Sequence, residues 1–236
     1  MIAVVEPETD WPRQWREYHT TRRIGRRCVI APPWEQPESA PGDCLITIDP
    51  GMAFGTGSHA TTQLALESLE KAVFDGARVA DIGTGTGILA IAAGLLGASC
   101  VLATDIDILA REIAQQNVEL HALRDTVEVL DPTEFWRLAD DCDIVVVNIV
   151  AGVILELAAR IADAVVPGGT VVLSGLVADQ APLICRALAD VGLVSPDVVE
   201  RDGWVALSLV ADPAARRDTG ALAAVQRELL RIGSAI

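Results

Sequence analysis

The residues best suited to chemistry are a glycine-rich segment and an acidic residue that follows it. The segment runs from Val79 to Gly87 and reads V-A-D-I-G-T-G-T-G, so an apolar run ends in a turn from which a helix can start. Asp105 closes the next apolar run, 18 residues after Gly87. This layout is typical of a site for a nucleotide-like cofactor, because the turn lets the cofactor approach the backbone and the acid can bind ribose hydroxyls.

The spacing of the glycines indicates which cofactor fits. A dinucleotide fingerprint requires its third glycine at position 88, which is occupied by Ile88. Gly83, Gly85 and Gly87, with Asp81 two residues before the first, instead suit S-adenosylmethionine, which has no pyrophosphate to place at a helix N-terminus. We therefore expect S-adenosylmethionine rather than NAD, with Gly83 and Gly85 among its contacts. A plain strand-to-helix turn is the alternative.

Two further residues stand where strands are expected to end. In open α/β sheets, ligands bind outside the carboxyl ends of the strands. Asp105 ends one strand and is assigned to the ribose, whereas Asp107 is assigned to capping the helix that follows. Asn148 ends another strand, and its position leaves two roles open, a helix cap or a catalytic amide.

The segment from Asp49 to Thr62 is rich in glycine and hydroxyl residues and precedes a predicted helix. It could be only a connector in which Thr61 or Thr62 caps that helix. His59 alone is weak evidence for catalysis, because a lone histidine is more often structural.

Strands and helices must alternate to place these residues together. The apolar patterns predict, in order, helix 61–74, strand 78–82, helix 87–96, strand 99–104, helix 107–121, strands 126–130 and 143–147, helix 151–165, strand 169–174, helix 178–191, and strands 194–200 and 204–210. Strands separated by helices imply parallel pairing with helices on both faces. The last two strands, split by a turn at 201–203, predict a hairpin. The sequence thus predicts an α/β fold with a doubly wound, mostly parallel, seven-stranded Rossmann-like sheet and a C-terminal antiparallel hairpin.

The ends of the chain follow another pattern. A short helix is predicted at 11–18, short strands at 28–30 and 44–48, and an amphipathic helix at 212–232. We divide the chain into an N-terminal tail and linker-like segment (1–43), a cofactor-binding domain (44–210) and a C-terminal helical extension (211–236).

Composition excludes some classes of protein. With a net charge of −15, a broadly nucleic-acid-coating surface is not expected. Six of the 18 basic residues nevertheless lie close together, and a solvated face is favoured over a partner patch for them: Arg13, Arg16, Arg22, Arg23, Arg26 and Arg27. The five cysteines show no C-x-x-C pair, which predicts buried thiols in a reducing cytosol rather than a metal site. No signal peptide or long apolar run is visible, so a cytoplasmic protein without membrane contact is expected.

Several motifs together resemble one family. They are 49–62, 81–93 with its glycines, Asp105-Ile106-Asp107, Asn148-Ile149-Val150-Ala151-Gly152, Pro167-Gly168-Gly169, Leu173-Ser174-Gly175 and Trp204-Val205-Ala206-Leu207. Between residues 11 and 210 the chain is similar to the PrmA family, the ribosomal protein L-eleven methyltransferases. The resemblance implies an S-adenosylmethionine-dependent enzyme that methylates amino groups of a protein. It also implies that Thr62, Gly83, Asp105 and Asn148 contact the cofactor, with Phe54, Thr56 and His59 closing over it.

The chain departs from the family pattern at several points. Ser58 and Ala60 replace the more usual Thr and Pro, and Val153 stands where Pro is common. Family members usually carry a further N-terminal domain that recognises the ribosomal protein, and this chain starts at about the linker that follows it. The substrate is therefore expected to be ribosomal protein L-eleven or a similar lysine-bearing protein, modified on lysine or N-terminal amino groups.

The expected chemistry places Asn148 at the amine. Methyl transfer from a sulfonium is an in-line displacement, so the acceptor must be aligned and must arrive without its proton. A neutral amide oxygen can orient an amine without stabilising the ammonium as a carboxylate would. The alternatives are a methyltransferase of the same fold for small molecules or nucleic acid, and a non-catalytic cofactor-binding protein.

Overall fold

The computed structural model describes residues 19–50, 53–215 and 225. Its main sheet has seven strands in the order β6-β5-β4-β7-β8-β10-β9. These are β4 (Arg78–Ile82), β5 (Cys100–Thr104), β6 (Val127–Leu130), β7 (Cys142–Asn148), β8 (Val165–Val177), β9 (Leu193–Arg201) and β10 (Trp204–Ala211). The first five pair in parallel, and β10 pairs antiparallel with both β8 and β9. The predicted fold class, including the C-terminal hairpin, is confirmed.

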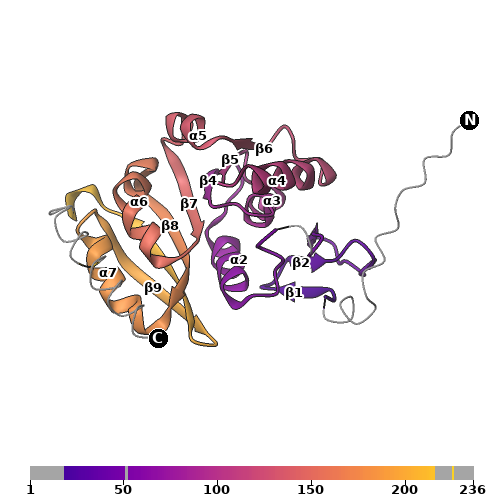
Figure 1. Cartoon of the computed structure of the whole chain (residues 1–236), viewed down its shortest axis with the longest axis horizontal. Helices are drawn as coiled ribbons and strands as arrows, with labels where there is room; N and C mark the ends of the chain where they lie inside the picture. The colour runs from indigo at the N-terminus through magenta and orange to yellow at the C-terminus, as the bar shows by residue number, and fades with distance from the viewer. Residues whose placement is uncertain (1–18, 51–52, 216–224, 226–236) are drawn as a thin grey trace, which may run out of the picture.

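Helices cover both faces of this sheet (Figure 1). They are α2 (Ala60–Ala72), α3 (Ile88–Leu96), α4 (Ile108–Leu120), α5 (Pro132–Leu138), α6 (Ala151–Ala164) and α7 (Ala181–Ala189). α2, α3 and α4 contribute to one buried cluster, and α5, α6 and α7 contribute to the other. The central parallel strands β4, β5 and β7 are largely buried on both sides, which is why they appear in the sequence as mostly apolar runs.

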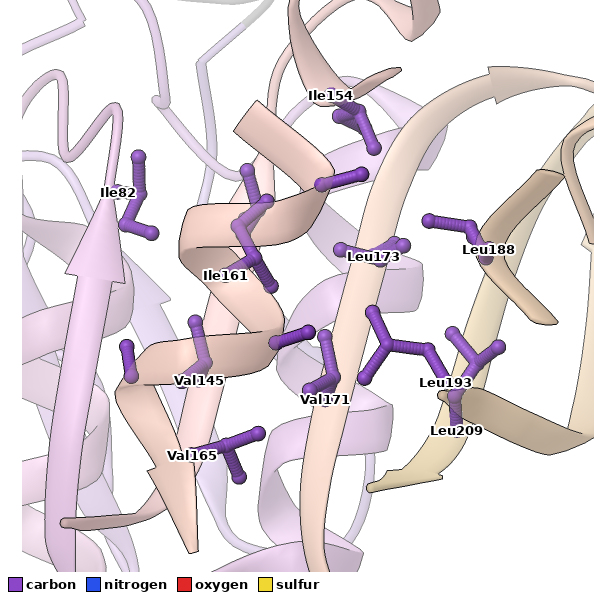
Figure 2. Close-up of a cluster of buried hydrophobic side chains, with 14 of the residues drawn as sticks. Ile82, Val145, Ile154, Ile161, Val165, Val171, Leu173, Leu188, Leu193 and Leu209 are labelled. Atoms are coloured by element: carbon purple, nitrogen blue, oxygen red, sulfur yellow. The ribbon is translucent and has the colours of Figure 1, made fainter. Parts of the chain in front are cut away.

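The larger core lies between the sheet and α6 and α7 (Figure 2). Val145 and Leu173 face Ile154 and Ile161 of α6, and all four side chains are fully buried. Burial of such a side chain contributes about 1.5–3 kcal/mol. This packing fixes β7 beside β8, so the ends of these strands form a rigid base for the residues that follow them.

A small second sheet precedes α2. It consists of β1 (Arg22–Ile24), β2 (Cys28–Ala31) and β3 (Cys44–Thr47), with β1 antiparallel and β3 parallel to β2. Ile24, Ile30 and Ile46 are buried in the same cluster as α2 and α3. Residues 22–31 therefore pack onto the larger unit, while the domain division at residues 43 and 210 stays a prediction.

Some predicted elements need correction. β1 and α5 were not expected. Asp131 is the N-cap of α5, and its carboxylate accepts from the backbone N of Thr133 at 2.8 Å. β8 starts at Val165 instead of residue 169, directly after α6. The predicted helix 178–191 opens with a 3₁₀ turn, η1 (Ala178–Gln180), and α7 ends at Ala189.

The two terminal helices fall mostly beyond the described part of the chain. The predicted helix 11–18 lies wholly outside it. Of the predicted helix 212–232, the structure describes 212–215 and Val225: Pro213–Ala215 form a 3₁₀ turn, η2, and Val225 is helical and packs against the larger core. Within residues 19–50, 53–215 and 225, no helix combines the length and hydropathy that crossing a membrane requires.

Candidate functional site

The predicted site residues meet at β4, the strand from which the chain order runs outward in both directions. β4 is central, with β5 and β6 following on one side and β7 and β8 on the other. The glycine turn follows β4, Asp105 follows β5, and Asn148 is the last residue of β7. Parallel strands end at the same edge, and the crevice at such a switch point is the usual ligand site of open α/β sheets. The fold therefore brings the glycines, Asp105 and Asn148 to one place.

The glycine turn has a backbone that other residues would strain. Gly83 and Gly85 have φ angles of 78° and 55°, in the left-handed region. A Cβ at Gly83 would lie 2.4 Å from the Ile149 side chain, and one at Gly85 would lie 2.5 Å from the carbonyl oxygen of Phe54. The turn is thus compressed between the loop before α2 and the loop after β7, and only glycine fits both positions.

Asp81 supports this turn from below. Its fully buried carboxylate accepts from the Thr84 hydroxyl at 2.6 Å and from the backbone N of Ala90 at 3.1 Å, both through Oδ2. Burial raises the pKa of Asp81 to about 7, although both donors act to lower it. Asp81 therefore fixes the turn to α3 through Oδ2, while its Oδ1 is buried without a partner among the described residues.

Asp105 and Asp107 both accept hydrogen bonds from the backbone, but at different places. Asp105 accepts from the backbone N of Gly85 through Oδ2 and from that of Asp107 through Oδ1, each at 3.0 Å. Asp107 is the N-cap of α4 and accepts from the backbone N of Leu109 at 2.9 Å, which confirms its predicted capping role. The ribose contact of Asp105 stays a prediction.

Asn148 is not a helix cap. α6 begins after Val150, which has no side-chain capping bond, so that alternative is wrong. Instead, Asn148 Nδ2 donates to the hydroxyl of Thr62 at 3.4 Å, while Oδ1 is buried and has no partner among the described residues. Thr62 is itself fully buried. The structure thus places Thr62 behind Asn148, where it orients the amide.

The loop before α2 lies against the glycine turn. Thr86 donates its backbone N–H to the Phe54 carbonyl at 3.1 Å and its hydroxyl to the Gly55 carbonyl at 2.7 Å. The Phe54 side chain is 64% exposed, and the hydroxyls of Thr56 and Ser58 lie 2.8 Å apart. Phe54 and Thr56 are therefore near the turn, and an exposed Phe54 ring is available to a ligand.

His59 has a structural role, as the sequence alone favoured, and its predicted closing over the cofactor stays a prediction. It is the N-cap of α2, and its Nδ1 accepts from the backbone N of Thr61 at 3.3 Å, so the expected caps Thr61 and Thr62 were wrong. Its ring contacts the edge of Trp204, with centroids 5.0 Å apart. Trp204 begins β10 and was missed as a site residue, because only tertiary packing brings it to this loop.

Two of the clustered arginines, Arg23 and Arg27, are bonded to residues that directly precede β3 of the small sheet. Arg23 pairs with Asp43 through two contacts of 2.7 Å, which hold the pKa of Asp43 at about 2. Arg27 donates from Nε to the Gly42 carbonyl at 2.9 Å. These contacts agree with a structural, solvated face. In the part of the chain that the structure describes, no group of three or more His, Cys, Asp and Glu side chains could hold a metal ion.

Comparisons with known proteins show the family of this chain. The family model described as "Ribosomal protein L11 methyltransferase (PrmA)" matches residues 4–212. A ribosomal protein L11 methyltransferase of Pelotomaculum thermopropionicum is 43% identical over 201 residues, which are 85% of this chain and 65% of that protein. One from Syntrophotalea carbinolica is 41% identical over 221 residues, 89% of this chain and 71% of that protein. The chain thus spans about two thirds of the length of these relatives.

The fold of this chain is also similar to that of solved methyltransferase structures. A crystal structure of ribosomal protein L11 methylase from Lactobacillus delbrueckii subsp. bulgaricus is 33% identical with a TM-score of 0.75, covering 82% of this chain and 100% of that chain. A precorrin-6y C5,15-methyltransferase from Geobacter metallireducens, at 18% identity and a TM-score of 0.55 over 65% of this chain and 90% of that chain, shares the fold alone.

Proposed function

Because the chain belongs to the family of ribosomal protein L11 methyltransferases, we propose that it transfers methyl groups from S-adenosylmethionine to amino groups of a protein. The proposed acceptor is ribosomal protein L11, on lysine side chains or the N-terminal amine. The observation that carries the proposal is Asn148: its amide is oriented by Thr62, and its buried Oδ1 is left to accept from a ligand beside the glycine turn. Since ribosomal proteins are made in the cytoplasm, we place the reaction there.

The residues of the turn fit S-adenosylmethionine. Gly83 and Gly85 allow the tight turn between Ile149 and the Phe54 carbonyl, and Asp105 presents a carboxylate at the end of β5, where ribose hydroxyls can donate to it. The exposed ring of Phe54 lies on the loop that contacts the same turn. When bound, S-adenosylmethionine supplies a methyl group on a sulfonium, which needs no metal for activation.

Asn148 is proposed to position the acceptor amine. A lysine amine has a reference pKa near 10.4, so its neutral form must be favoured as it reaches the site. The Asn148 oxygen accepts one amine hydrogen and directs the nitrogen lone pair without adding negative charge. The partly buried Ile149, the residue after Asn148, provides apolar surface nearby, which desolvates the amine and lowers its pKa.

The test is labelled methyl transfer from S-adenosylmethionine into purified ribosomal protein L11, followed by mass spectrometry of the product. We expect label on amino groups, and calorimetry should show binding of S-adenosylmethionine but not of NAD. Binding without transfer to L11, but with transfer to another protein of a cell lysate, would contradict the proposed substrate. Absence of binding would contradict the proposed activity.

A further inference from the structure

A chain of side-chain contacts connects the C-terminal hairpin to the loop before α2. Arg201, the last residue of β9, donates from Nη1 to Oε1 of Gln63 at 3.1 Å. Gln63 lies on α2 and donates from Nε2 to the carbonyls of Gly57 at 3.2 Å and Ser58 at 3.1 Å. Gln63 therefore connects the end of β9, which is distant in sequence, to the loop just before α2, and the β9–β10 hairpin packs against α2 (Figure 1).

The partners of Gln63 allow only one orientation of its amide. A guanidinium has donors only, so the group facing Arg201 must be the amide oxygen. The carbonyls of Gly57 and Ser58 are acceptors only, so the group facing them must be the amide NH₂. Arg201 thus selects the orientation in which Gln63 can bind the loop.

Arg201 is itself fixed by a second partner on α2. Its Nη2 contacts both carboxylate oxygens of Glu67, at 3.0 and 3.1 Å. The side chains of Arg201 and Glu67 are 35% and 24% exposed, so the pair is partly shielded from water. Gln63 and Glu67 are four residues apart and lie on the same face of the helix, which lets one guanidinium contact both.

The far end of the same loop contacts the glycine turn. Thr86 donates to the Phe54 and Gly55 carbonyls, as described above. In between, a Cβ at Gly57 would lie only 3.2 Å from the Ile30 side chain of β2, so the loop is also in contact with the small sheet. The side-chain hydrogen bonds of Gln63 to the carbonyls of residues 57 and 58 hold the loop against the glycine turn and the small sheet.

We propose that Arg201 is a positioning residue that acts through Gln63 to keep residues 53–58 against the glycine turn, in the conformation that retains S-adenosylmethionine. This inference rests on the proposed function, because it assigns the loop to cofactor retention. It goes beyond that function by assigning a task to the β9–β10 hairpin.

The decisive variant is Gln63→Glu. A glutamate keeps and strengthens the contact with Arg201, but it presents an oxygen to the Gly57 and Ser58 carbonyls and can donate to neither. We expect an unchanged melting temperature, with KM for S-adenosylmethionine raised about tenfold, as two lost hydrogen bonds imply, and a smaller change in kcat. Gln116→Glu, the same change on an exposed face of α4, is the matched control and should change neither constant.

A second readout does not depend on activity. The backbone N–H of Thr86 is bonded to the Phe54 carbonyl, so its hydrogen exchange reports whether the loop lies on the turn. In the protein without added cofactor, we expect exchange at Thr86 to be faster in Gln63→Glu than in the wild type. If binding and transfer fail in the wild type, the proposed function is wrong, whereas unchanged exchange in the variant contradicts only the positioning role.

The indirect action of Arg201 is tested by combining variants. Arg201→Met should raise KM for S-adenosylmethionine about threefold, because Gln63 then loses one of its partners and its side chain is held less firmly against the loop. In a Gln63→Met background, the same substitution should have no further effect. Arg201→Lys, which still donates to Oε1, should restore most of the affinity. An effect of Arg201→Met that persists in the Gln63→Met background would show that Arg201 acts through Glu67 and the fold alone, and would overturn the proposal.

Discussion

Asn148 and Thr62 are hydrogen-bonded across 86 positions of sequence, with Nδ2 of Asn148 donating to the Thr62 hydroxyl at 3.4 Å. In this arrangement the amide nitrogen faces Thr62, and Oδ1 is buried without a partner among the described residues. Because Thr62 is fully buried at the start of α2, it orients Asn148 from behind. A helix that begins beside the loop is thereby coupled to the proposed catalytic residue at the end of β7.

Replacing Thr62 by valine should therefore impair catalysis more than cofactor binding. Valine keeps the shape of the side chain but cannot accept from Asn148, so the amide loses its preferred orientation. A hydrogen bond of about 1 kcal/mol corresponds to a roughly fivefold fall in kcat, with little change in the Kd of S-adenosylmethionine. Thr62→Ser keeps the hydroxyl and should retain activity. A Kd that rises as much as kcat falls in Thr62→Val would instead indicate direct contact of Thr62 with the cofactor.

Replacing Asn148 by alanine or aspartate separates its two proposed contributions. Asn148→Ala removes the acceptor of the amine hydrogen, and we expect kcat to fall by about two orders of magnitude. Asn148→Asp restores an acceptor but adds negative charge, which raises the pKa of the bound amine and leaves more of it protonated. The rate profile of the aspartate variant should therefore move to higher pH relative to wild type, as measured by initial rates between pH 7 and 10. An unshifted profile would show that Asn148 does not face the amine.

The sequence predicts the main sheet well because the central parallel strands β4, β5 and β7 are largely buried on both faces. The run from Ile144 to Val147 can hardly form anything else, and the glycines after β4 require their unusual backbone. β1 was missed because two of its three residues, Arg22 and Arg23, are charged and exposed. Its stability depends on long-range partners such as Asp43, which no local pattern reveals.

The strand-end residues of the site could also be predicted from the sequence. Gly83, Gly85, Asp105 and Asn148 follow strands whose order could be inferred, so their meeting was foreseeable. The presence of Trp204 and Arg201 beside the loop depends on where the C-terminal hairpin packs. The capping role of His59 is local, but histidine is not among the residues that usually cap helices. Since β10 inserts between β8 and β9, residues near position 201 reach α2, and sequence spacing carries no signal for this.

Gly175, which lies on β8, should be as important for stability and activity as Gly83 and Gly85 of the turn. Its φ is 83°, and a Cβ there would lie 2.3 Å from the carbonyl oxygen of Ile149, the residue after Asn148. Gly175→Ala should therefore displace the Asn148 loop, with stability falling by about 1–3 kcal/mol and activity falling further. Gly168→Ala is the control, because Gly168 has a φ of 80° but open space around its Cβ position. Equal losses in both variants, by denaturant unfolding and by rate, would show that backbone strain alone matters at position 175.

Asp81 should make stability decrease with rising pH. Its pKa is 3.8 when unfolded and about 7 when folded, chiefly because burial disfavours the charged carboxylate. The folded protein thus binds more protons than the unfolded chain between these values. The stabilising contribution is fully present below pH 3.8 and is lost as pH rises through about 7, by at most about 4 kcal/mol. In denaturant titrations from pH 4 to 8, Asp81→Asn should lack this decline relative to wild type, whatever its absolute stability.

Asp43 should give stability the opposite dependence on pH. Its contact with Arg23 lowers its pKa to about 2, so its contribution is present above pH 3.8 and is lost as pH falls toward 2. Asp43→Asn should therefore change the stability profile only in the acidic range, whereas Asp81→Asn changes it between pH 4 and 7. Parallel profiles for wild type and Asp81→Asn over that range would mean that the bonds from Thr84 and Ala90 keep the Asp81 carboxylate ionised. Asp81 would then support the turn as an anion, and the protonated form would have no part in folding.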